Sequence, residues 1–225
     1  GDVDGHKGLL AIPTCSTTPL AMTLAALGAK NPVKRVIAST YQSVSGTGAA
    51  AVAELNTQAA QVLAGQPTTA AAYPHQIAFN VLPHIGSLKE DGYYSEEVKM
   101  RQETQKILHR PDIAISTTCV RVPVPICHSE TVNIEFERPM DPDEARELLA
   151  AFPGIVVVDD PANGVYPMPI DAAGTDETYV GRVRSDSSHP NGLALWIVSD
   201  NLRKGAATNA IQIAEEIVKR GAWLR

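Results

Sequence analysis

The chain has 225 residues, of which 44% are hydrophobic and 20% are charged, and its net charge is −6. This composition is typical of a globular protein with a sizeable core, and an acidic balance without a cluster of Lys and Arg argues against nucleic-acid binding. No apolar stretch approaches the roughly 20 residues that span a bilayer. The first eight residues are polar and do not form a signal peptide, so we expect a cytoplasmic protein.

The chain holds three cysteines, Cys15, Cys119 and Cys127. They are too few and too scattered for a disulfide framework, which favours a reducing compartment. None of them forms a C-x-x-C pair, so we expect no metal site.

The first half of the chain mixes predicted strands and helices. In chain order, we expect a buried strand at 9–13, a helix at 18–28 that ends at Gly28, a strand at 33–40, a helix at 49–64 that ends before Gly65, a loop at 66–76, and a helix at 95–108 with Ser95 as its N-cap. The sequence starts without Met and reaches an apolar run almost at once, which suggests a piece of a longer protein.

The second half is richer in strands. These are predicted at 113–124, 131–137, 155–160, 178–186 and 193–200, with a helix at 141–152 capped by Asp141 and a final helix at about 205–219. Segment 131–137 alternates strictly between apolar and polar residues, as in a sheet with one exposed face. The succession of strands predicts an α+β fold.

The segment GTGAAA (46–51) fits the dinucleotide-binding fingerprint in its letters. The fingerprint needs a strand that runs directly into the first glycine and an acid about 20 residues later. Residues 41–45 separate Gly46 from the predicted strand and 64–74 hold no acid, so we do not expect a phosphate-binding loop here.

Cys15 follows an apolar run and precedes a predicted helix. Unpaired N–H groups and the helix dipole at that position favour a thiolate and can lower the pKa of the thiol. Such a cysteine is a candidate nucleophile, with backbone N–H groups nearby for an oxyanion. The alternative is an ordinary buried cysteine.

His128 is the histidine with the most suggestive context, because it precedes the strand at 131–137 and lies seven residues after Arg121. A guanidinium for a carboxylate and an imidazole for proton transfer can then face one pocket. The alternative, which the spacing alone favours, is a histidine in a surface turn and a solvated arginine. Glu96 and Lys99, three residues apart on a predicted helix, form either a surface ion pair or an acid and a base for a ligand. Gln42 lies just after a predicted strand, in a loop of small residues.

Six segments together resemble one family, the bacterial aspartate-β-semialdehyde dehydrogenases. They are CSTTPLAM, RVIASTYQSVSGTG, IAFNVLPHI, EEVKMRQETQKIL, TTCVRVPVPICHSETVNIE and VSDNLRKGAATNAIQIAE. They occur in the family's order and cover nearly the whole chain. The resemblance implies a catalytic and dimerisation domain like that of glyceraldehyde-3-phosphate dehydrogenase at 1–200, with a mixed, largely antiparallel sheet flanked by helices, and a C-terminal helix at 201–225.

The resemblance also implies a role for each matching residue. Cys15 is the nucleophile that carries the acyl group, His128 the acid/base, and Gln42 positions the intermediate. Arg121 binds the substrate α-carboxylate, Glu96 the amino group, and Lys99 the phosphate, while Ser45, Gly46 and Asn201 contact the nicotinamide half of NADP. The implied reaction is the NADP-dependent conversion of β-aspartyl phosphate to aspartate semialdehyde by a homodimer, in lysine, threonine and methionine biosynthesis.

Two departures from the family stand out. Thr14 occupies the place of an Asn that helps to hold the oxyanion, and the loss of one such donor can cost about 10²–10³-fold in rate. The family's N-terminal Rossmann domain does not match any part of this sequence, so we expect weak NADP binding and an exposed apolar face on the final helix at Ile211, Ile213, Ile217 and Val218. The alternatives are an N-acetyl-γ-glutamyl-phosphate reductase, a non-catalytic dimerisation module, and a cysteine hydrolase built on Cys15 and His128.

Overall fold

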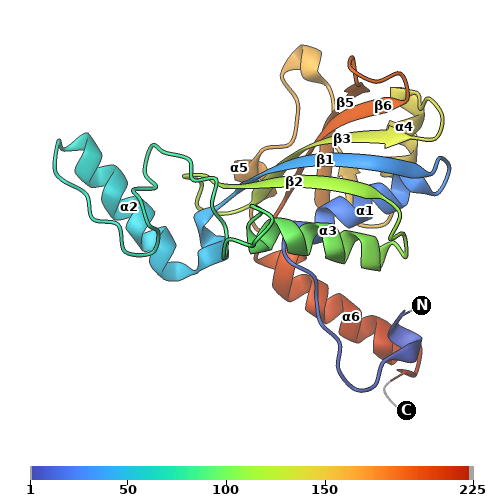
Figure 1. Cartoon of the computed structure of the whole chain (residues 1–225), viewed down its shortest axis with the longest axis horizontal. Coiled ribbons are helices and arrows are strands. Elements are labelled where there is room, and N and C mark those ends of the chain that lie inside the picture. The colour runs from blue at the N-terminus through green and yellow to red at the C-terminus, as the bar shows by residue number, and fades with distance from the viewer. Residues whose placement is uncertain (1, 223–225) are drawn as a thin grey trace.

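A single six-stranded sheet forms the centre of the protein in its computed structural model, which describes residues 2–222 (Figure 1). The strand order is β2-β1-β3-β6-β5-β4, with bounds Ala114–Arg121, Val33–Gln42, His128–Phe136, Gly192–Ser199, Thr178–Ser185 and Ile155–Val157. The β1–β3, β3–β6 and β5–β6 pairs are antiparallel, whereas β1–β2 and β4–β5 are parallel. The expected α+β fold with a mixed, largely antiparallel sheet is confirmed.

Helices cover one face of this sheet. They are α1 (Thr17–Gly28), α3 (Ser95–Ile107) and α4 (Pro142–Ala150), which lie side by side behind and below the strands in Figure 1. The alternation of buried and exposed residues along β1 and β3 sends every second side chain into this layer. The resulting core includes Leu20, Leu24, Met100, Ile134, Phe136, Leu195 and Ile197. The strict alternation seen at 131–137 is thereby explained.

The register of the sheet aligns polar residues at one end of three strands. Gln42 pairs with Arg121, His128 pairs with Ser199, and the pairing of Tyr41 with Ser129 places Gln42 beside His128. We call Gln42, Arg121, His128 and Ser199 the upper row. All four side chains lie on the helix-covered face and are at most 5% exposed.

A lower row follows two residues further into each strand. Thr40 pairs with both Cys119 and Glu130, and Glu130 pairs with Ile197. These four residues are at most 1% exposed. The lower row is therefore a buried, partly polar layer directly beneath the upper row.

An arm extends from the sheet between β1 and α3. It contains a 3₁₀ turn (Val44–Thr47), α2 (Ala49–Leu63) and a long loop, which together project away from the strands (Figure 1). The arm has a small core of its own, formed by Val44, Ala51, Leu55, Ile77, Ala78 and Leu82. GTGAAA lies at the base of this arm, after Gln42 has ended the strand, and is not part of a strand-to-helix phosphate loop.

The predicted strand at 9–13 is wrong. This segment is irregular, and Leu9 is 87% exposed. An apolar run becomes a strand only when a neighbouring strand takes its backbone hydrogen bonds, and no strand within residues 2–222 pairs with this segment. The predicted strand at 113–124 ends at Arg121 because Pro123 and Pro125 cannot donate to a ladder.

The prediction of Ser95 as an N-cap is also wrong by one residue. Ser95 is the first residue of α3 and Tyr94 is the cap. Glu97 accepts a hydrogen bond from the Tyr94 N–H at 2.6 Å, which satisfies one of the free donors at this helix end. Asp141, in contrast, caps α4 as predicted and accepts from the Asp143 N–H.

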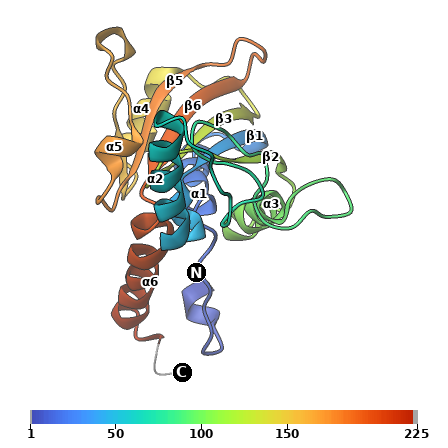
Figure 2. The same cartoon turned by 90° about the vertical axis from the view of Figure 1, so that its left-hand side faces the viewer.

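The final helix, α6 (Thr208–Lys219), follows a π-helical turn (Arg203–Ala207) and hangs below the sheet beside the N-terminal segment (Figures 1 and 2). No residue of α6 is buried, and Ile211 and Val218 are 58% and 65% exposed. The expected exposure of its apolar face therefore holds for Ile211 and Val218, whereas Ile213 and Ile217 are half-buried. The helices within residues 2–222 include none that is both long and apolar enough to cross a membrane.

Candidate active site

Cys15 and His128 meet at the end of the sheet. Cys15 lies in the turn before α1, and its Sγ is 3.1 Å from Nε2 of His128, the first residue of β3. The two residues are 113 positions apart in the chain. A thiol in hydrogen-bond contact with an imidazole is the arrangement that nucleophilic cysteine chemistry needs.

The turn around Cys15 is tightly packed. The carbonyl of Thr14 accepts hydrogen bonds from the N–H groups of Thr17 and Thr18, which begins α1. On the other side, a Cβ atom on Gly205 would come within 2.8 Å of the Cys15 Cβ, so the backbone of the π-helical turn touches the nucleophile. Only glycine allows this approach.

Burial keeps both members of the pair neutral. It raises the pKa of the Cys15 thiol to about 12, with a further increase from the charge of Glu96, against lowering by Arg121 and by the N–H groups of Cys15 and Ser16. Burial and the charge of Arg121 lower the pKa of His128 to about 3. The expectation that the helix end lowers the pKa of Cys15 is wrong, because desolvation outweighs the nearby N–H groups.

His128 is surrounded by a network of small polar residues. The Ser43 N–H donates to His128 Nδ1 at 3.0 Å, and the Ser43 hydroxyl lies 3.1 Å from the same atom. Asn201 Oδ1 accepts from the hydroxyls of Ser43 and Ser45 and from the Cys127 N–H. All of these side chains are buried.

Arg121, Gln42 and Glu96 complete the pocket. Arg121, at the end of β2, donates to the Ser43 carbonyl at 2.5 Å. Gln42, at the end of β1, donates to Glu96 Oε1 at 3.4 Å. The buried Nε of Arg121 and Oε1 of Gln42 have no hydrogen-bond partner among the described residues, which is unusual for buried polar groups.

The residues predicted to bind the phosphate and the cofactor differ in how exposed they are. Lys99 is exposed on α3, one turn after Glu96, and residues 2–222 show no ion pair between the two. Gly46 is exposed, and a Cβ there would lie 3.0 Å from Arg121 Nη1 and 3.3 Å from His128 Nε2. Ser45 and Asn201 are buried and bond each other, so of the three predicted cofactor contacts only Gly46 presents an open surface.

Two acidic residues of this region were not predicted. Glu103 on α3 accepts from both the N–H and the hydroxyl of Thr14, each at 2.8 Å. Glu130 in the lower row is 1% exposed, and neither of its carboxyl oxygens has a partner among the described residues. Desolvation raises its pKa well above the usual range. The part of the chain that the structure describes contains no group of three or more potential metal ligands.

Comparison with known proteins identifies relatives of this arrangement. Residues 24–204 match the family described as "Semialdehyde dehydrogenase, dimerisation domain". The chain is 51% identical over 216 residues to the aspartate-semialdehyde dehydrogenase of Aquifex aeolicus and 42% identical over 226 residues to that of Bacillus subtilis. These matches cover 96% and 97% of this chain, but only 64% and 65% of the relatives, so the chain spans less than two thirds of their length.

Solved structures show the same fold. The aspartate semialdehyde dehydrogenase II of Vibrio cholerae, complexed with ASA, superposes with a TM-score of 0.89 at 43% identity, over 92% of this chain and 61% of that one. The Candida albicans aspartate semialdehyde dehydrogenase with NADP superposes with a TM-score of 0.67 at 25% identity, over 92% of this chain and 56% of that one.

Proposed function

Because the chain belongs to the semialdehyde dehydrogenase family, we propose that it is the catalytic and dimerisation part of an aspartate-semialdehyde dehydrogenase. Its reaction is the interconversion of β-aspartyl phosphate and aspartate semialdehyde through a thioester on Cys15. The observation that carries the proposal is the 3.1 Å contact between Cys15 Sγ and His128 Nε2 beside a buried arginine.

In the biosynthetic direction, the sulfur of Cys15 attacks the acyl carbon of β-aspartyl phosphate. A C–S bond forms, the bond from carbon to the phosphate oxygen breaks, and inorganic phosphate leaves together with the proton of the Cys15 thiol. The deprotonated form of the thiol is the nucleophile, and Arg121 stabilises it because its charge lowers the pKa of Cys15. The resulting thioester lies between Gln42 and His128.

Arg121 and Glu96 select the amino acid. A guanidinium binds a carboxylate with two parallel hydrogen bonds, and Arg121, whose buried Nε has no hydrogen-bond partner among the described residues, is proposed to bind the substrate α-carboxylate. Glu96 faces a free α-amino group. An N-acetyl-γ-glutamyl-phosphate reductase acts on an acylated amine, which has no positive charge for Glu96, so this residue favours the aspartyl substrate.

NADPH, when bound, would supply the hydride that reduces the thioester; with one proton, the C–S bond then breaks and releases the aldehyde and the Cys15 thiol. The exposed backbone at Gly46 lies beside His128 and Arg121, and a side chain there would come within 3.0 Å of Arg121 Nη1, so glycine keeps the approach to these two residues open. Ser45 and Asn201 act on this site indirectly, by supporting Ser43. The product, aspartate semialdehyde, leads to lysine, threonine and methionine. Lys99, on the exposed side of α3, is proposed to meet the phosphate.

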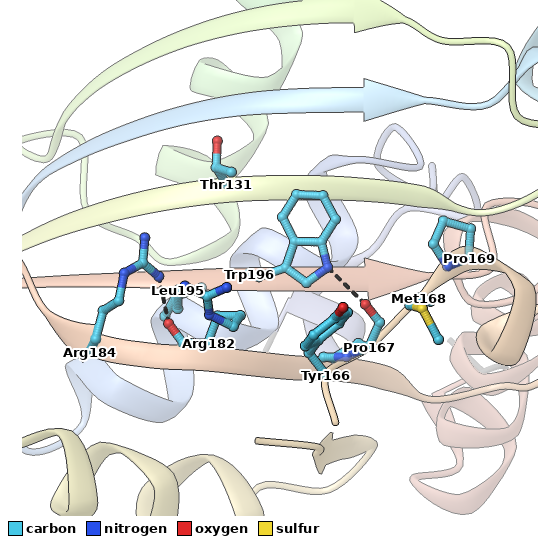
Figure 3. Close-up of a pocket in the computed structure, with 9 residues that line it drawn as sticks. All are labelled: Thr131, Tyr166, Pro167, Met168, Pro169, Arg182, Arg184, Leu195 and Trp196. Carbon is cyan, nitrogen blue, oxygen red and sulfur yellow. Dashed lines mark hydrogen bonds between the residues drawn. The ribbon is translucent and has the colours of Figure 1, made fainter. Parts of the chain in front are cut away.

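The open face of the sheet is the proposed homodimer surface (Figure 3). Tyr41 and Trp196 lie on this face with ring centroids 5.5 Å apart, and Trp196 Nε1 donates to the Pro167 carbonyl at 2.9 Å. A hollow of about 300 Å³ is lined there by Thr131, Tyr166, Pro167, Met168, Pro169, Arg182, Arg184, Leu195 and Trp196. Arg182 and Arg184 rim the hollow, and an apolar floor with a charged rim is typical of a protein interface.

The proposal is tested by NADP-dependent, phosphate-requiring oxidation of aspartate semialdehyde. The assay compares the chain alone with the chain supplied with the part of a relative that it does not cover, about one third of that relative's length. The Cys15→Ala variant of each form is measured alongside. Turnover that requires Cys15 in either form supports the proposal. Absence of turnover in both forms, with a folded protein, contradicts it and favours a non-catalytic dimerisation module.

A further inference from the structure

We infer that Ser43 fixes His128 as the neutral imidazole with its proton on Nε2, so that the ring acts as a hydrogen-bond donor toward Cys15 and the reacting oxygen. This inference rests on the proposed function for its catalytic meaning. The geometry that supports it does not depend on any substrate. Ser43 is a positioning residue in this account, because it acts through His128.

The backbone of Ser43 determines the proton position. Its N–H lies 3.0 Å from Nδ1 of His128, and a backbone N–H can only donate. Nδ1 must therefore carry a lone pair. A neutral imidazole has one protonated nitrogen, so the proton is on Nε2, the atom that faces Cys15 Sγ at 3.1 Å.

A doubly protonated ring does not fit this position. The second proton would lie on Nδ1 and point at the Ser43 N–H, and the ring itself is only 2% exposed. The charged and titratable groups nearby do not offset this, because Arg121 is the charge that shifts the pKa of His128. Arg121 on β2 disfavours a second positive charge on the ring, the Cys15 thiol is uncharged at neutral pH, and Glu96 on α3 acts on Cys15 and Arg121.

Ser43 is itself held in place by hydrogen bonds from its carbonyl and its hydroxyl. The Ser43 carbonyl accepts from Arg121, and its hydroxyl donates to Asn201 Oδ1 at 3.1 Å. Asn201 also accepts from the N–H of Cys127, which precedes His128 and has a φ of 74°. A non-glycine residue in this conformation is unfavourable on its own, so the hydrogen bond to Asn201 helps to hold Cys127 in it. The His128 ring is therefore fixed both by Ser43 and by the residue that precedes it in the chain.

The proton on Nε2 sets the direction of the hydrogen bond between His128 and Cys15. Nε2–H donates to the sulfur, so His128 in this tautomer stabilises the sulfur charge and does not accept the thiol proton, which leaves with the phosphate; the acid/base role that the resemblance implies for His128 is then that of a donor. The same N–H can donate to the oxygen that develops negative charge on the thioester carbon, in the manner of a neutral histidine that acts as an electrophile. In a cysteine hydrolase the other ring nitrogen donates to an orienting acceptor. Here it accepts, which disfavours that alternative.

Nitrogen NMR of ¹⁵N-histidine-labelled full chain tests the inference without any substrate. We expect one pyrrole-type signal and one pyridine-type signal for His128 at pH 7, with the pyrrole type assigned to Nε2 through its coupling to the ring protons. A His128→Gln spectrum assigns the signals. A pyrrole-type Nδ1, or two protonated nitrogens at pH 7, would overturn the inference, whatever the enzymatic activity.

Two variants of Ser43 separate the backbone donor from the hydroxyl. Ser43→Pro removes the N–H, and the native φ of −64° is already that of proline. Ser43→Ala keeps the N–H and is the matched control. We expect Ser43→Pro to shift the His128 signals toward the other tautomer or a mixture, and Ser43→Ala to leave them unchanged. An unchanged tautomer in a folded Ser43→Pro protein would overturn the role of Ser43, and the wild-type spectrum tests the tautomer even if this variant does not fold.

Discussion

Glu103 binds Thr14 through one carboxylate oxygen, which accepts both the backbone N–H and the hydroxyl of Thr14 at 2.8 Å. Thr14 immediately precedes Cys15, and the Thr14 hydroxyl also lies 2.7 Å from that of Thr17. The Thr14 hydroxyl hydrogen is therefore engaged within the protein. In this chain the residue before the nucleophile anchors the turn, and its hydroxyl hydrogen is not free to replace the oxyanion donor that the family's Asn supplies.

Removal of the Thr14 hydroxyl should therefore weaken the turn. A hydrogen bond to a charged group contributes about 1.5–3 kcal/mol, and Thr14 is half-buried, so we expect Thr14→Val to lower the free energy of unfolding by about 1.5 kcal/mol in urea titrations. Thr14→Ser keeps the hydroxyl and is the control. The turnover number should fall with the valine variant and recover with serine. Equal behaviour of the two variants would show that the hydroxyl is not the anchor.

The charge of Glu96 should disfavour the ionised form of Cys15. Its negative charge raises the pKa of the thiol, so Glu96→Gln should lower that pKa and increase the rate of alkylation by iodoacetamide at pH 8. Mass spectrometry follows Cys15 specifically, with the buried Cys119 and Cys127 as internal references. Glu90→Gln, an exposed change in the loop before α3, is the control. An unchanged alkylation rate in Glu96→Gln would contradict this electrostatic assignment.

Gly205 should not tolerate a side chain. A Cβ at this position would lie 2.8 Å from the Cys15 Cβ, with the Cys15 backbone also within 3.2 Å. We expect Gly205→Ala to cost about 1–3 kcal/mol of stability, as overpacking does, and to reduce turnover by about 10²-fold because the nucleophile is displaced. Gly5→Ala, where a Cβ would meet nothing within 4 Å, is the control. Normal turnover in Gly205→Ala would show that the turn is free to move.

Glu130 should make the protein less stable as the pH rises. Its pKa is raised in the folded state, so above about pH 4.5 the unfolded chain loses this proton while the folded chain keeps it. The free energy of unfolding then falls by about 1.4 kcal/mol per pH unit from this group, until the pH reaches the folded pKa. Glu130→Gln should remove that slope in urea titrations between pH 5 and 7. A parallel slope in both proteins would show that Glu130 is ionised when folded.

The sequence predicted the sheet better than it predicted the site. Alternation at 131–137 and the cap at Asp141 are local patterns, and the structure confirms both. The prediction of a strand at 9–13 failed because the apolar residues of this segment do not reveal whether a neighbouring strand is present. The prediction of a lowered pKa for Cys15 failed because a helix end is visible in the sequence, whereas the burial that outweighs it is not.

Ser43 and Glu103 could not be identified from residue type. Ser43 acts through its backbone N–H, which every residue except proline has, and it lies 85 positions from His128. Glu103 is 89 positions from Thr14, within a helix rich in charged residues. Only the tertiary structure distinguishes these two residues from others of the same kind.

The register of β1, β2 and β3 has a consequence for how this protein can vary. Gln42, Arg121 and His128 lie side by side because each strand has a fixed count of residues between its core positions and its end. A deletion of one residue in any of these strands would turn Tyr41, Val120 or Ser129 toward the helices. Length changes in the loop at 66–76 leave that alignment untouched. Insertions and deletions should therefore accumulate in the arm, while the three strands change only by substitution.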